Sequence, residues 1–66
     1  MLGLQKECVY RLKSGEQAVF KWWGETGKPV FHPPGEPSFQ DVFILDDWQE
    51  HVTEFVRRAT DADLGI

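Results

Sequence analysis

The stretch Phe20–His32, FKWWGETGKPVFH, decides the fold, because aromatic and apolar residues stand on both sides of a turn signal. Glu25-Thr26-Gly27 suits a three-residue hairpin loop whose last position is left-handed, a conformation that glycine adopts at least cost. The predicted pairs are Trp23 with Pro29, Trp22 with Val30, Lys21 with Phe31, and Phe20 with His32. Since side chains alternate between the faces of a strand, the neighbouring tryptophans are predicted to lie on opposite faces.

A second hairpin is predicted upstream, around the turn signal Ser14-Gly15-Glu16. Its flanks alternate apolar and polar residues, which is typical of half-buried strands. We expect a loop with an odd number of residues, because an even number would set Gln17 and Lys21 among the core residues. The predicted pairs are Leu12 with Ala18, Tyr10 with Phe20, and Cys8 with Trp22.

The segment FQDVFIL, residues 39 to 45, predicts a fourth strand with apolar residues on both faces. It follows a proline-rich crossing loop at residues 33 to 37. Pro29 has no amide hydrogen to donate, so the third strand is predicted to be an edge strand or to be bulged there.

A helix is predicted from residue 46 or 47 to near Thr60. Asp46 or Asp47 can cap it, each followed three residues later by a glutamine or glutamate that completes a capping box. Two arginines in the last turn suit the helix dipole. The helix would have one apolar stripe, formed by Trp48, Val52, Phe55, Val56 and Ala59. The tail beyond it is predicted to fray or to fold back through Leu64 and Ile66.

These elements predict an α+β fold in one small domain, residues 1–66: a four-stranded antiparallel sheet (β-β-β-β) with one C-terminal helix packed on one face. The helix would cover the face that carries Tyr10, Leu12, Phe20, Trp22 and Val30. The opposite face would stay uncovered, and it carries Val9, Arg11, Val19, Lys21, Trp23 and Phe31. Uncovered apolar surface of this kind usually marks a binding or subunit contact.

The candidate binding residues are Arg11, Lys21, Trp23 and Phe31 on that uncovered face. Tryptophan, phenylalanine and arginine are enriched at protein contacts, which favours a protein partner. Basic residues interleaved with aromatic ones also grip single-stranded nucleic acid, which is the alternative. Capture of a small nucleotide-like ligand is a third interpretation, and partial exposure without function is a fourth.

Charge separates these partner classes. The net charge is −4, and residues 1 to 35 hold five basic and three acidic residues, whereas residues 36 to 66 hold two basic and eight acidic residues. An acidic chain argues against broad, charge-driven binding to duplex DNA. Residues 1 to 35 have a net charge of +2, so a small basic patch on the N-terminal half is still a possible binding surface.

Composition also bears on the compartment. Cys8 is the only cysteine, which excludes an internal disulfide bond and a thiolate metal cluster. No run approaches the roughly 20 apolar residues of a membrane span, and the first residues lack the apolar core of a signal peptide. We expect a soluble protein of the cytoplasm that does not bind a membrane.

Neither a metal site nor a catalytic site is predicted. His32 and His51 are the only histidines, and they lack the spacing of metal ligands. Cys8 falls on the predicted core face with no base beside it, where a thiol behaves as a small hydrophobe. A helix cap accounts for Asp46-Asp47. We therefore expect no enzyme activity, no metal and no cofactor.

Two families offer resemblances. The run from Val19 to Ala59, with its Gly-Lys-Pro turn, its strand VFIL and the segment DDWQEHVTEFVRRA, resembles the single-stranded-DNA-binding transcriptional coactivator family. That resemblance implies a four-stranded curved sheet, one helix and a dimer. The segments CVYRL, AVFKWW and VFILDDW are also similar to a small actinobacterial domain of unknown function found beside helix-turn-helix regulators.

The functional expectation is a small, non-enzymatic regulatory or inhibitory module that binds a protein and forms a homodimer. Tiny domains of this kind are also typical of phage-encoded inhibitors, which is an argument by association.

Overall fold

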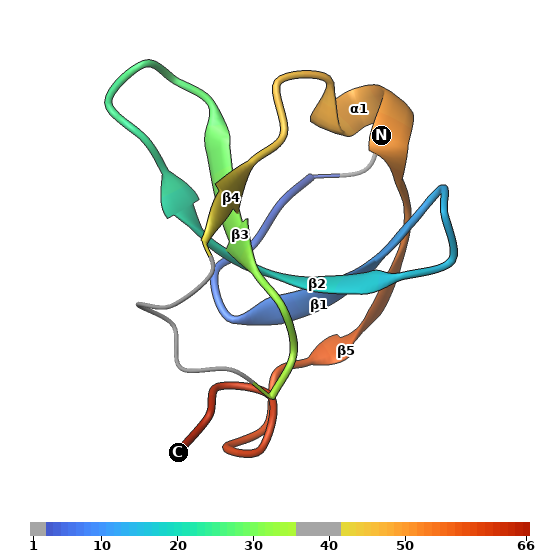
Figure 1. Cartoon of the computed structure of the whole chain (residues 1–66), viewed down its shortest axis with the longest axis vertical. Helices are drawn as coiled ribbons and strands as arrows, with labels where there is room; N and C mark the ends of the chain where they lie inside the picture. The colour runs from blue at the N-terminus through green and yellow to red at the C-terminus, as the bar shows by residue number, and fades with distance from the viewer. Residues whose placement is uncertain (1–2, 36–41) are drawn as a thin grey trace.

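Five β-strands form one antiparallel sheet, with one short helix before the last strand, in the computed structural model, which describes residues 3–35 and 42–66 (Figure 1). The elements are β1 (Cys8–Leu12), β2 (Gln17–Trp23), β3 (Pro29–His32), β4 (Phe43–Ile44), α1 (Trp48–His51) and β5 (Val52–Arg58). Their order across the sheet is β4-β3-β2-β1-β5, so the last strand lies beside the first. Of the predicted strand at residues 39 to 45, residues 39–41 lie outside the described residues.

Both predicted hairpins form, and each closes through a three-residue loop that ends on a left-handed glycine. Gly15 has φ 94° and Gly27 has φ 79°. In the first loop the Leu12 amide donates to the Glu16 carbonyl at 2.7 Å, and in the second the Gly24 amide donates to the Lys28 carbonyl at 2.8 Å. The odd loop length predicted for the first hairpin is confirmed. Its pairing is offset by two residues, because Cys8 lies opposite Phe20 and Tyr10 opposite Ala18.

The long C-terminal helix is the main error of the sequence prediction. Only Trp48–His51 is helical, and Val52–Arg58 is a strand that pairs antiparallel with β1. Valine, threonine and phenylalanine fill four of its seven positions, and these residue types favour strands. The strand also satisfies the backbone groups along β1, which a helix packed across the sheet would leave unpaired.

β5 contains two bulges, and because of them its apolar residues are spaced along the sequence as they would be on a helix. The register shifts between Val9 and Tyr10 and again between Arg11 and Leu12, so seven residues of β5 lie against five of β1. Every third residue of β5 then faces the same side. Residues at intervals of three or four also line one face of a helix, so the apolar spacing alone does not distinguish the two structures.

A third bulge lies in β2, and it changes the face on which each tryptophan lies. The predicted pairs of Trp22 with Val30 and Trp23 with Pro29 are confirmed, but the register shifts beyond them, so that Phe20 lies opposite Phe31. Lys21 is the extra residue. As a result Trp23 shares a face with Phe20, and Trp22 lies on the other face. The predicted face assignments of Trp22, Trp23, Val30 and Phe31 are therefore wrong.

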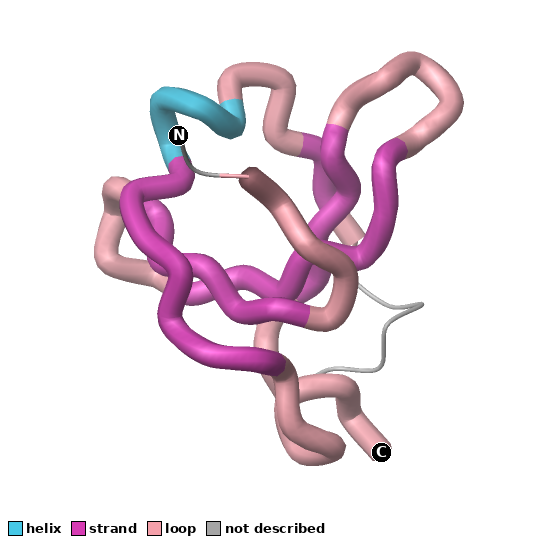
Figure 2. The backbone as a smooth tube through the Cα atoms, turned by 180° about the vertical axis from the view of Figure 1, so that it is seen from behind, coloured by secondary structure: helices cyan, strands magenta, loops and turns pink. Residues whose placement is uncertain are grey.

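The core lies on one side of the curved sheet, called here the inner face. Its buried cluster comprises Cys8, Tyr10, Ala18, Phe20, Phe31 and Val52. The segment that leads into β1 crosses this side (Figure 2), where Leu4 packs against the cluster and the Tyr10 hydroxyl donates to the Gly3 carbonyl at 3.2 Å. The curvature of the sheet and this segment close the core, the role that the sequence assigned to a helix.

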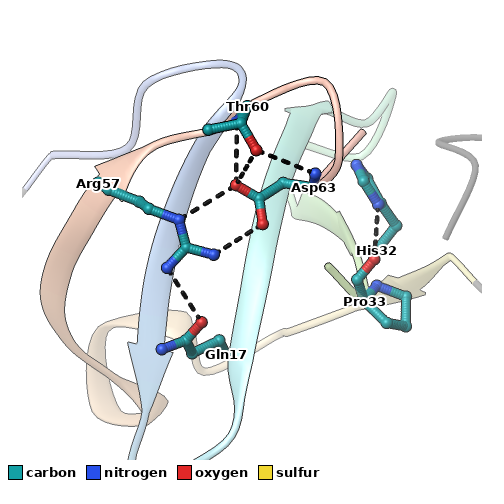
Figure 3. Close-up of polar contacts among 6 residues, drawn as sticks. All are labelled: Gln17, His32, Pro33, Arg57, Thr60 and Asp63. Carbon is teal, nitrogen blue, oxygen red and sulfur yellow. Dashed lines mark hydrogen bonds and ion pairs between the residues drawn. The ribbon is translucent and has the colours of Figure 1, made fainter. Parts of the chain in front are cut away.

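The opposite side, called here the outer face, is partly covered. Val9 and Val19 lie on it opposite one another and are fully buried. The C-terminal turn is held beside them, since Arg57 of β5 pairs with Asp63 (Figure 3). The Gly35 amide also donates to the Asp63 carbonyl at 2.9 Å. The tail therefore folds back, which was one of the two predicted alternatives. It is held by Asp63 and the half-buried Leu64, whereas Leu64 and Ile66 were predicted to hold it. Ile66 is exposed.

Candidate functional site

One end of the outer face exposes large apolar side chains from β2 and from β4, on either side of β3. Trp22 is 49% exposed and Ile44 is 56% exposed, and both lie in register with the buried Val30 between them. Adjacent strands are about 5 Å apart, so the two exposed side chains stand roughly 10 Å apart on one face. Val42, two residues before Ile44, is also exposed. We call this set, Trp22, Val30, Val42 and Ile44, the outer patch.

Lys21 borders the outer patch at the β2 bulge. Its ammonium lies 4.5 Å from the centroid of the Trp22 ring, within the range of a cation–π contact. The cation therefore occupies one face of the indole. The patch thus combines an apolar centre with a positive charge at its margin.

Trp23 projects from the other side of the same hairpin. Its ring packs edge to face against Phe20, with centroids 5.5 Å apart, and against Trp48, with centroids 5.9 Å apart. The Trp23 side chain is still 46% exposed, so it forms the rim of the core. Lys28, directly after the hairpin loop, pairs with Asp46 at 3.1 Å and ties the hairpin to the turn before α1.

The structure does not bring the four predicted binding residues together. Phe31 is fully buried in the core between Phe20 and Phe43, so its ring is closed to any ligand. Arg11 is on the outer face at the far side of the sheet, paired with Glu54 at 2.7 Å. Trp23 lies at the rim of the inner face. Only Lys21 borders the outer patch.

Trp22 and Ile44 were not predicted from the sequence as surface residues, although the two neighbouring tryptophans were correctly predicted to lie on opposite faces. Alternation assigned Trp22 to the core, and the apolar residues on both faces of FQDVFIL assigned Ile44 to a central or two-sided strand. The structure places Ile44 on β4, at the end of the strand order. Pro29 predicted that β3 would be an edge strand or would be bulged. β3 instead lies between β4 and β2, and the bulge of this hairpin is in β2.

The most heavily bonded polar group is the Asp63 carboxylate, which has a structural role. It accepts from Arg57 Nε at 3.1 Å, from an Arg57 terminal nitrogen at 2.7 Å and from the Thr60 amide at 2.9 Å (Figure 3). The hydrogen bond from Arg57, and then that from the Thr60 amide, lower the pKa of Asp63 to about 2. Every oxygen of this carboxylate is thus engaged within the chain.

The other buried titratable groups also have partners within the fold or lie among apolar side chains. Burial raises the pKa of Tyr10, whose hydroxyl also accepts from the Gln5 amide at 2.8 Å. His32 is buried, with Nδ1 3.0 Å from the Pro33 carbonyl. Cys8 is a buried thiol of the core cluster.

The predicted cap of α1 forms only in part. Asp47 occupies the N-cap position, but its side chain makes no capping hydrogen bond. The turn is closed by the backbone instead, because the Asp47 carbonyl accepts from the amides of Glu50 and His51.

Neither a metal-holding group of three His, Cys, Asp or Glu side chains nor a membrane-spanning helix occurs within residues 3–35 and 42–66. No protein-family model, curated protein or solved structure matches the chain. The resemblances to the coactivator family and to the actinobacterial domain stay predictions. Functional inference therefore rests on the surfaces of this chain.

Proposed function

We propose that this chain is a small, non-enzymatic binding module that acts through protein contact, and that the outer patch joins two copies of it. The observation that supports this proposal is the pairing of Trp22 and Ile44, both half-exposed, across the buried Val30. A contiguous apolar surface on a small domain is typical of a protein contact. Tryptophan, which the patch contains, is among the residue types that contribute most at such contacts.

A second copy is the occupant that suits the size and chemistry of the chain. A domain of 66 residues has a small core, and burying two such patches against each other would add apolar contact at about 25 cal/mol per Å², before the cost of association. A symmetric contact places the same patch on both sides, so apolar centre meets apolar centre. Lys21, at the margin, would remain in contact with water.

The proposal assigns no catalytic role, and the way two buried polar groups are used supports it. Asp63 is bonded to Arg57 and Thr60, and Cys8 lies among apolar side chains. A module of this kind would act by occupying the surface of another protein, as regulatory and inhibitory domains do. The single buried thiol agrees with a reducing compartment such as the cytoplasm.

Sedimentation equilibrium at tens of micromolar tests the proposal. The wild type is expected to be a dimer whose melting temperature rises with protein concentration. Ile44→Lys is expected to be a folded monomer whose melting temperature does not depend on concentration, because Ile44 is exposed in the monomer. Ile66→Lys is the matched control: the same exposed residue type changes to the same charge outside the patch, and the dimer should persist. A monomeric wild type, or a dimeric Ile44→Lys, would overturn the proposal.

Single-stranded nucleic acid is the alternative partner, and a salt series distinguishes it. Phosphate contacts release counterions, so binding of a fluorescent oligothymidine would fall steeply with added salt and with Lys21→Ala. Self-association through an apolar patch should change little with salt, because exposed charges contribute little and are screened. Tight, salt-sensitive oligonucleotide binding that is lost with Lys21→Ala would replace the proposed function with the alternative.

A further inference from the structure

Trp23 and Trp48 form an aromatic corner at the rim of the inner face, away from the outer patch. Their rings stand at 74° to one another, with centroids 5.9 Å apart. Trp23 is nearly half exposed, and Trp48 is partly buried against the core, which fixes the position of its ring. Two indoles at this angle offer π faces from two directions, an arrangement that suits a cation better than it suits an anion.

The turn beside Trp48 is acidic. Asp46, Asp47 and Glu50 are exposed and, with Trp48 and Gln49, line a shallow hollow. Within the described part of the chain, Asp47 and Glu50 form no ion pair, and the Asp47 side chain does not cap α1. Two carboxylates are therefore available next to the aromatic corner.

One cation of the chain already approaches this surface. Lys28 extends from the loop that follows Trp23 and places its ammonium 3.1 Å from Asp46. That contact shows that a basic side chain reaches the acidic turn from the direction of the hairpin. It satisfies one carboxylate and leaves the charge of the other two unbalanced.

We infer that the corner of Trp23 and Trp48 binds a cationic side chain, an arginine guanidinium or a lysine ammonium, from a partner protein. The aromatic faces would attract the cation, and Asp47 and Glu50 would pair with its charge. This inference rests on the proposed function, because it takes the partner to be a protein. It adds that the partner presents an arginine or lysine side chain to the corner. It uses a surface that the outer patch does not share, so dimer formation and cation binding can fail separately.

An NMR titration with N-acetyl-arginine amide tests this assignment on the full chain. The indole N–H signals of Trp23 and Trp48 should shift in a saturable way, with millimolar affinity, whereas that of Trp22 should stay in place. N-acetyl-glutamine amide, which is neutral, should produce no saturable shift. Shifts of equal size at all three tryptophans, or no saturation up to about 100 mM, would overturn the inference.

Charge variants separate a specific site from general attraction to an acidic protein. Asp47→Asn/Glu50→Gln should weaken binding at least about threefold, a change within the range of exposed ion pairs. Glu16→Gln/Asp61→Asn removes the same charge at exposed positions that do not line the hollow, and it should leave the affinity unchanged. All four positions are exposed, so both variants should fold. Equal weakening by the two variants would contradict a site at the corner.

Discussion

The Trp23 and Phe20 rings lie on the same side of β2, edge to face, with centroids 5.5 Å apart and an interplanar angle of 66°. Trp23 is three positions after Phe20, and in a regular strand two side chains three positions apart lie on opposite sides. The bulge at Lys21 makes the contact possible, because it removes one residue from the alternation. It also turns Trp22 to the outer face, and so one backbone irregularity creates both the aromatic corner and the outer patch.

Phe31 and Trp22 should respond in opposite ways to truncation. Phe31→Ala removes a fully buried ring from the core and should lower the free energy of unfolding by about 3–5 kcal/mol, enough to unfold a domain of this size. Trp22→Ala removes a half-exposed ring and, measured at a concentration at which the protein is monomeric, should cost about 1 kcal/mol or less. Urea denaturation followed by circular dichroism measures both. A stable Phe31→Ala variant would show that the ring lies outside the core.

Glu7 is the only described non-glycine residue with a positive φ, at 59°, and its backbone is fixed on both sides. Its amide donates to the Phe20 carbonyl at 3.0 Å, and its carbonyl accepts from the Ala59 amide at 2.7 Å. Glycine adopts this conformation freely, so Glu7→Gly should leave the melting temperature unchanged or raise it. Glu7→Val places a β-branched residue there and should cost about 1–2 kcal/mol. Equal effects of the two substitutions would contradict the backbone geometry.

Asp63 should make stability depend on acid. Its folded pKa of about 2 lies below its ordinary value, so the ionised form stabilises the fold. This contribution is fully present above about pH 4, and it is lost as the pH falls through the folded pKa. Thermal denaturation between pH 5 and pH 2 should show a smaller loss of stability for Asp63→Asn than for the wild type.

The control for this pH dependence is Asp61→Asn, which changes an exposed aspartate in the same turn. It should retain the acid sensitivity of the wild type. Identical pH profiles for Asp63→Asn and the wild type would mean that the pairing of Asp63 with Arg57 does not contribute to stability.

β5 can be distinguished from a helix in solution. Residues 52 to 58 should show Hα–Hα contacts across to β1, in particular between paired residues such as Tyr10 and Phe55. The Phe55 ring should lie against Tyr10, since their centroids are 5.8 Å apart. NOE spectroscopy checks both contacts. A continuous series of sequential amide–amide contacts through this segment would indicate the helix instead.

Much of the sheet could be predicted from the sequence. The two glycine-closed turns fixed the hairpins, and Trp22 opposite Val30 followed from the loop length. Face assignments failed wherever a bulge interrupts the strand, because alternation assumes that every residue of one strand has a partner on the other. Lys21 in β2, and Thr53 and Val56 in β5, are the residues left without a partner in the register.

The candidate site depended on the same irregularities. The β2–β3 hairpin, whose aromatic and basic residues drew attention to it, carries two exposed rings, Trp22 and Trp23. Which ring faces outward was decided by the Lys21 bulge, and no pattern of residue types in FKWWGETGKPVFH distinguishes a bulged strand from a regular one. The neighbour of Trp23 was also unpredictable, because Trp48 was assigned to a long helix that the segment does not form.

A dilution series followed by two-dimensional amide and indole NMR tests most directly the claim that the outer patch is the contact surface. As the protein is diluted from millimolar to low micromolar concentration, the indole signal of Trp22 and the amide signals of Val42 and Ile44 should move together along one dissociation curve. The indole signals of Trp23 and Trp48, and the amide signal of Ile66, should stay in place. Concentration-independent signals at Trp22 and Ile44, or changes confined to Trp23 and Trp48, would contradict this account.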